Sequence, residues 1–141
     1  MKAFSRNIAF CALVLFCEPI AAAPKQRVVI VSGPTVVAFF PPVTQAELSN
    51  EPDTNEALAD FRYYAARVRE RAGEVGIDFE EIEASSFSVK CGAKTMVFRP
   101  KKTKVGYYFV APGKSPHVEY GVMTDSDILH IATEYFQIAP K

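Results

Sequence analysis

The chain has 141 residues, of which 49% are hydrophobic, and it carries 16 basic and 16 acidic side chains. This length and hydrophobicity are typical of one globular domain that buries its own core. The even charge leaves no excess of cations to neutralise a phosphate backbone, which argues against nucleic acid as a partner.

The N-terminus has the pattern of a cleavable signal peptide over residues 1–23. Lys2 and Arg6 precede the apolar run Ile8–Phe16, and small residues follow, with cleavage expected after Ala22 or Ala23. The apolar run is far shorter than the roughly 20 residues that span a bilayer. We therefore predict a secreted or periplasmic protein with no stable membrane anchor.

The exported part, residues 24–141, is predicted to be a single domain with one thiol. Of the three cysteines, Cys11 and Cys17 lie in the leader, which leaves Cys91. One cysteine cannot form an internal disulfide or a Cys-x-x-Cys redox pair. The stability of the domain must therefore come from its core.

Two apolar strands are predicted at the start of the domain. Val28–Val31 has the pattern of a short buried strand, and Thr35–Phe40 that of a central strand that is apolar on both faces. Pro41-Pro42 ends the second strand. The spacing of Thr44–Glu47 is that of a capping box and predicts one helical turn.

A long amphipathic helix is predicted to follow a second capping signal at Asp53–Glu56. Six apolar residues then recur in steps of three and four, which places them on one stripe of a helix. Gly73 and Gly76 are the available stops. The stripe consists of Leu58, Phe61, Ala65, Val68, Ala72 and Val75.

The middle of the chain shows only short extended pieces. Ile77 and Phe79 alternate with acidic residues, which predicts a strand with one solvated face. Further extended pieces are expected around Phe87–Val89 and Thr95–Phe98, in an otherwise irregular region.

The C-terminal third predicts a hairpin followed by a helix. Gly106–Val110 and His117–Val122 flank a tight connection, as in an antiparallel hairpin. Thr124–Asp127 then caps an amphipathic helix. Its apolar stripe consists of Ile128, Ile131, Ala132, Tyr135 and Phe136.

The order of these elements predicts an α/β or α+β fold with a central mixed sheet flanked by helices. It resembles the core of the thioredoxin-like fold. Thr35–Pro41 is similar to that fold's central strand as it enters the active-site loop, and Gly106–Phe136 is similar to its C-terminal hairpin and helix.

The residues that carry thiol chemistry in such proteins are missing. Thioredoxin-like oxidoreductases hold Cys-x-x-Cys in the loop where this chain has Pro41–Thr44. Peroxiredoxins place a threonine three residues before the reactive cysteine, whereas Glu47 follows Thr44 at that spacing. Lys104 and Val105 replace the proline expected before the hairpin. The resemblance therefore implies a domain without the family's catalysis.

Cys91 is the only thiol candidate for a catalytic residue in the exported domain. Lys90 and Lys94 lie nearby, and positive neighbours favour a reactive thiolate. A quiet, buried thiol and a disulfide between chains are the alternatives. His117 and His130 have no ligand spacing with it, so we predict no metal and no cofactor.

Two charged clusters and a tyrosine pair complete the candidates. The acidic cluster Asp78–Glu83 and the basic cluster Arg99–Lys104 could pair across a sheet or remain solvated. Tyr107 and Tyr108 point to opposite sides of their strand, so one of them is expected to be exposed. Exposed aromatic residues are typical of binding surfaces.

We expect from the sequence an exported, noncatalytic domain that binds another protein through the Pro41–Glu51 loop. Two alternatives remain open: a redox enzyme or sensor that uses Cys91, and a domain that binds a small apolar ligand between the sheet and the long helix. The sequence leaves the partner and the oligomeric state open.

Overall fold

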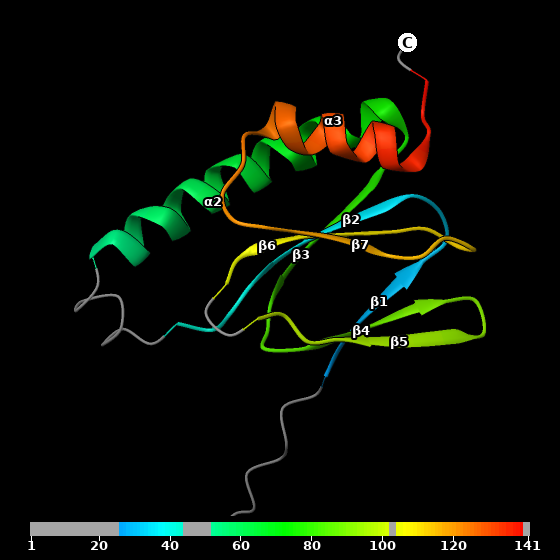
Figure 1. Cartoon of the computed structure of the whole chain (residues 1–141), viewed down its shortest axis with the longest axis horizontal. Helices are drawn as coiled ribbons and strands as arrows, with labels where there is room; N and C mark the ends of the chain where they lie inside the picture. The colour runs from blue at the N-terminus through cyan, green and yellow to red at the C-terminus, as the bar shows by residue number, and fades with distance from the viewer. Residues whose placement is uncertain (1–25, 44–51, 102–103, 140–141) are drawn as a thin grey trace, which may run out of the picture.

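A computed structural model describes residues 26–43, 52–101 and 104–139 (Figure 1). Three expectations lie outside the described residues: the signal peptide over residues 1–23, the helical turn at Thr44–Glu47, and the rest of the candidate loop up to Glu51.

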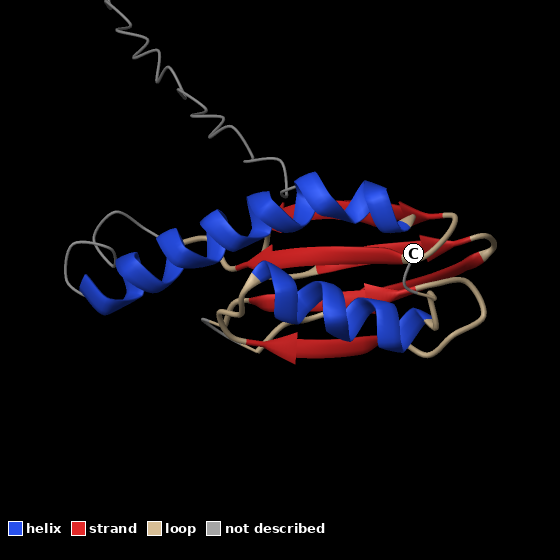
Figure 2. Cartoon of the chain, turned by 90° about the horizontal axis from the view of Figure 1, so that it is seen from above, coloured by secondary structure: helices blue, strands red, loops and turns tan. Residues whose placement is uncertain are grey.

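The described chain forms three layers (Figures 1 and 2). Two helices cover one face of a four-stranded sheet, and a three-stranded sheet packs against its other face. In chain order the elements are β1 (Arg27–Val31), β2 (Thr35–Phe40), α2 (Pro52–Ala72), the 3-10 helix η1 (Gly73–Val75), β3 (Asp78–Glu83), β4 (Phe87–Cys91), β5 (Lys94–Phe98), β6 (Gly106–Val110), β7 (His117–Tyr120) and α3 (Asp125–Phe136).

The four-stranded sheet has the strand order β3-β2-β6-β7. The neighbours β2 and β3 are parallel, and α2 forms the crossover between them. β6 is antiparallel to both β2 and β7. The α+β class, the mixed central sheet, the C-terminal hairpin and the helix after it are thus confirmed.

β2 lies inside the sheet, between β3 and β6, and all six of its residues are buried. Val36, Ala38 and Phe40 face the helices. The alternate residues Val37 and Phe39 face the three-stranded sheet. A strand that is apolar on both faces requires a covering layer on each side, and both layers are present.

The stripe of α2 packs on the sheet as predicted, with five of its six residues buried and Val75 half-buried. The α-helix ends at Ala72 and continues as η1. Gly76 then adopts a left-handed backbone with φ of 75°, and its amide donates to the carbonyl of Gly73. Glycine suits this position because other residues are strained at positive φ.

The three-stranded sheet was not expected. Its order is β1-β4-β5, with β1 parallel to β4 and β4 antiparallel to β5. The region that the sequence left irregular thus contains a hairpin. The prediction that Val28–Val31 is fully buried is wrong: Val28 is 57% exposed and Ile30 is 80% exposed, because only one face of this sheet is covered.

One further expectation is wrong. Tyr107 and Tyr108 are both buried, because both faces of the four-stranded sheet are covered.

Of the two alternatives for the charged clusters, pairing across the sheet does not occur among the described residues, because β3 pairs there only with β2. The clusters approach at one place, where Glu83 and Arg99 line the same hollow. Glu81 of the acidic cluster instead pairs with Arg69 of α2, with 2.9 Å between Nη2 and Oε2.

The first prediction concerns Gly106, where β6 lies tightly against its neighbours. A Cβ atom here would meet the carbonyl of Glu119 and would lie 2.9 Å from the Phe39 ring. We expect Gly106→Ala to lower the free energy of unfolding by about 2 kcal/mol through overpacking, as measured by urea denaturation. Gly33→Ala is the matched control, since nothing lies within 4 Å of its Cβ position. Equal stability of the two variants would contradict the expectation.

The second prediction concerns the link between the two helices. The buried carboxylate of Asp125 accepts a hydrogen bond from Arg71 at 2.6 Å and lies 3.4 Å from Nε of Arg67. These contacts, the Arg71 hydrogen bond above all, lower the pKa of Asp125. The resulting stabilisation is present above the unfolded pKa of about 4 and is lost as the pH falls through the lower folded pKa.

We therefore expect Asp125→Asn to cost about 1 kcal/mol at neutral pH, a modest amount because both arginines are nearly half exposed. Denaturation curves of variant and parent should converge as the pH falls below the lowered folded pKa of Asp125. Glu134→Gln on the same helix is the control, because that carboxylate is 70% exposed. A difference that persists unchanged at low pH would show that the ion pair is not its source.

Candidate functional site

The candidate site lies at the carboxyl end of β2. In open sheets with parallel strands joined by a helix, ligands bind beyond the carboxyl ends of the strands. Here β2 ends at Phe40, and the chain leaves the sheet through Pro41–Val43. The N-terminal turns of α2 and the segment before β6, Lys104–Val105, border the same place.

Two hollows meet at this end of the sheet, and both are lined by Pro41, Val43 and Leu58. We call them together the β2 groove. The smaller hollow has a volume of about 110 Å³ and the larger about 250 Å³. The larger one is also lined by Thr54, Ala57, Lys104, Val105, Gly121 and Val122.

The larger hollow offers mainly aliphatic surface. Val43, Leu58 and Val105 belong to the core under the helices or pack against it. Val122, at the rim, is 39% exposed. The volume of the larger hollow, about 250 Å³, is below the roughly 300–1,000 Å³ of pockets that hold drug-sized ligands. This hollow is therefore suited to an aliphatic side chain rather than to a larger compound.

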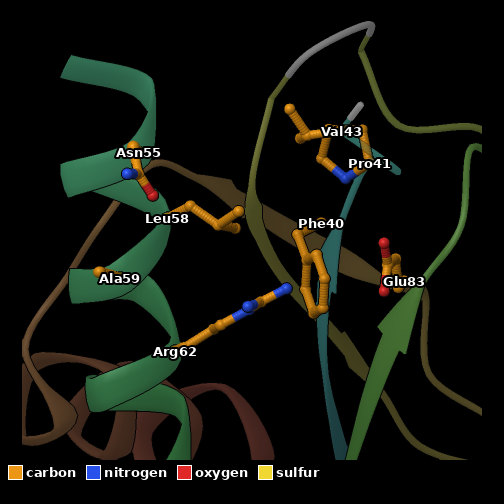
Figure 3. A pocket seen from close by; sticks show the side chains of 8 residues that line it. All are labelled: Phe40, Pro41, Val43, Asn55, Leu58, Ala59, Arg62 and Glu83. Atoms are coloured by element: carbon orange, nitrogen blue, oxygen red, sulfur yellow. The ribbon is translucent and has the colours of Figure 1, made fainter. Parts of the chain in front are cut away.

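The smaller hollow combines an aromatic wall with two charges. Figure 3 shows the Arg62 side chain extending from α2 toward the Phe40 ring, with Glu83 on the far side of that ring. The Arg62 guanidinium lies 5.0 Å from the ring centroid of Phe40, as in a cation–π contact. Glu83 is exposed at the end of β3. Both charges can therefore meet polar groups of a bound segment.

The described lining of the groove offers no thiol and no imidazole. Neither a cysteine nor a histidine contributes to either hollow. In the parts of the chain that the structure describes, no three His, Cys, Asp or Glu side chains gather as metal ligands. The chemistry that the described groove offers is apolar contact, charge and hydrogen bonding.

Cys91 lies at the other end of the molecule. It is half-buried at the end of β4 and lines a hollow of about 270 Å³ beside the β6–β7 turn. Because Thr35 at the start of β2 pairs with Val110, this turn is opposite to the β2 groove. Lys94 and Lys114 line the same hollow. The sequence indicated Lys94 as a neighbour, whereas Lys114 approaches only through the tertiary fold.

The two histidines lie apart from the thiol, and each contacts a carboxylate. Nε2 of His117 is 2.7 Å from Oε1 of Glu119, and its ring stacks on Tyr135 at a centroid distance of 5.6 Å. His130, which was expected to be exposed, has 70% of its side chain exposed and contacts Glu134 at 3.3 Å.

The proposed loop and the observed groove overlap in part. Pro41 and Val43 line both hollows, as expected from the position of this loop after the central strand. The sequence missed Val105, Val122 and Glu83. They reach the groove because the Gly121 amide donates to the Val105 carbonyl at 2.9 Å and because Glu83 pairs with Phe40 in the sheet register.

The chain matches no protein-family model, no curated protein and no solved structure. Within the described ranges, no helix is both long and apolar enough to cross a bilayer.

Proposed function

We propose that this protein is an exported, noncatalytic domain that binds a protein partner through the β2 groove. The observation that carries the proposal is the aliphatic lining of the larger hollow, at the strand end where open sheets bind their ligands. An extended segment of the partner would insert an aliphatic side chain between Leu58 and Val105.

The charged residues of the groove favour a bound segment with complementary charges. Lys104 borders the larger hollow, while Arg62 and Glu83 border the smaller one. An apolar centre with a polar rim is the usual anatomy of a protein interface. The rim favours a partner segment that carries both signs of charge beside its aliphatic anchor.

We also propose that the domain is thioredoxin-like. The strand order β3-β2-β6-β7, with both helices packed on one face of the sheet, supports this relation. Pro41–Thr44 would then stand in place of the redox cysteines, and Lys104 and Val105 in place of the proline expected before the hairpin strand. The charged, apolar and small segments of residues 1–23 follow the pattern of a signal peptide, which supports a secreted or periplasmic location.

The third prediction tests the groove in the native compartment. A photo-crosslinking amino acid at position 122 should give a discrete adduct with a partner protein, because Val122 lies at the rim of the larger hollow. The same amino acid at position 63 is the control, since Tyr63 is 58% exposed on α2 and lines neither hollow of the groove.

Two results would count against this proposal. The first is the same adduct from both positions, or none from position 122. The second is reduction of insulin disulfides or of peroxide at enzyme-like rates by the purified protein, which would overturn the noncatalytic assignment.

A second candidate function is redox sensing by Cys91. The observation in its favour is Lys94, which pairs with Cys91 in the sheet register and lines the same hollow. The ammonium of Lys114, which also lines this hollow, donates instead to the carbonyl of Tyr135. Cations close to a cysteine stabilise the thiolate, which is the form that reacts with oxidants and alkylating agents.

The fourth prediction separates this candidate from a quiet thiol. If Lys94 activates Cys91, Lys94→Gln should slow alkylation of the folded protein by iodoacetamide several-fold, as followed by mass spectrometry. Lys101→Gln, a lysine that does not line this hollow, should leave the rate unchanged. A Cys91 that stays unmodified in the native fold after mild oxidant would remove the redox function.

A further inference from the structure

The four edges of the two sheets differ in how they are protected. Edge strands attract other strands, and charges or prolines beside an edge normally prevent this. β3 carries four carboxylates, β5 begins with a lysine and is followed by an arginine and a proline, and β7 has only four residues and follows a proline. β1 carries one charge, at Arg27, before the four apolar residues Val28–Val31.

The outer edge of β1 is free in the part of the chain that the structure describes. β1 pairs with β4 on one side, and no described strand pairs with its other side. Val28 and Ile30 point away from the core, two residues apart on one face of the strand. Ile30, at 80% exposure, is the most exposed large hydrophobic residue in the described chain.

Cations outnumber carboxylates around this edge although the whole chain is neutral. One carboxylate comes close to it, since Glu83 of β3 lines a hollow with Arg27 and Arg99. The stretches that form and flank the three-stranded sheet, residues 26–34 and 87–101, contain no carboxylate. Five cations lie in them, and none belongs to an ion pair within the described ranges. They are Arg27, Lys90, Lys94, Arg99 and Lys101.

We propose that an acidic, extended segment of another protein adds to the free edge of β1 as a further strand. Backbone hydrogen bonds would supply affinity, as in other cases of strand addition. Val28 and Ile30 would contact apolar side chains at alternate positions of that segment. The carboxylates at the intervening positions would lie on the other face of the strand, where Arg27 would attract them. This surface is separate from the β2 groove and does not depend on it.

Charge favours an acidic strand over the other possible occupants. Two copies joined at β1 would combine two cationic sheets with no carboxylate in either to offset their repulsion. A lipid surface would engage the whole outer face, including Val97, which is 51% exposed on β5. Strand addition requires only β1 and the residues beside it.

The fifth prediction uses a labelled ten-residue peptide of alternating valine and glutamate, titrated with the full-length protein and followed by fluorescence anisotropy. We expect saturable binding that weakens as salt is added. A matched peptide with lysine in place of glutamate should bind at least tenfold more weakly. A peptide with prolines at two central valine positions should do the same, because proline cannot donate a backbone hydrogen bond.

Two matched variants of the protein locate the binding. Ile30→Ser should weaken binding of the valine–glutamate peptide at least fivefold, because it removes the aliphatic contact next to the edge. Val97→Ser makes a similar change on the same face, two strands away, and should leave binding unchanged. Both side chains are more than half exposed, so both variants should unfold at the temperature of the parent.

Four results would overturn the proposal. They are an absence of saturable binding, equal binding of the proline-containing peptide, equal losses for Ile30→Ser and Val97→Ser, and a dimer in sedimentation equilibrium that Ile30→Ser dissociates. The last would identify a second copy as the occupant. Binding to anionic vesicles without binding to the peptide would likewise replace the acidic strand with a lipid surface.

Discussion

The burial of β2 on both faces is the constraint on which the other elements depend. Its consecutive residues Phe39 and Phe40 point into different cores, with Phe39 against the ring of Phe98 and Phe40 against that of Phe61. A strand of this kind is stable only if a separate layer covers each face. The stripe of α2 meets the requirement on one side, and the three-stranded sheet meets it on the other. The two cores therefore follow from one six-residue segment.

The same constraint creates the β2 groove. β2 has to leave the sheet where both covering layers end, and Pro41-Pro42 prevents the strand from continuing. Leu58 and Val105 belong to the helix-side core but also line the larger hollow, so the hollow is an open end of that core. Binding an aliphatic side chain there would extend the core by one residue. Recognition at this site thus needs no element beyond those that stabilise the fold.

The sequence predicted the parts of the fold that local periodicity determines. The 3.6-residue period identified α2 and α3, a run apolar on both faces identified β2, and two strands around a tight connection identified the β6–β7 hairpin. β1 was misjudged because a continuous apolar run has the same pattern whether one face or two are covered. No local pattern could predict that Val29 would pair with Val89 in a second sheet. For the same reason the sequence located the Pro41 side of the groove but not Val122, which depends on strand register.

The parallel pairing of β1 with β4 has a consequence for synthesis. Arg27 precedes its partner Phe87 by 87 − 27 = 60 residues, so β1 is made well before β4 exists. At about 5–20 residues per second, this interval lasts roughly 3–12 s. During that time the apolar run Val28–Val31 has no partner strand, and its contacts are too distant in sequence to form early. The nascent chain of this protein therefore carries an extended apolar segment without its partner strand until β4 has emerged.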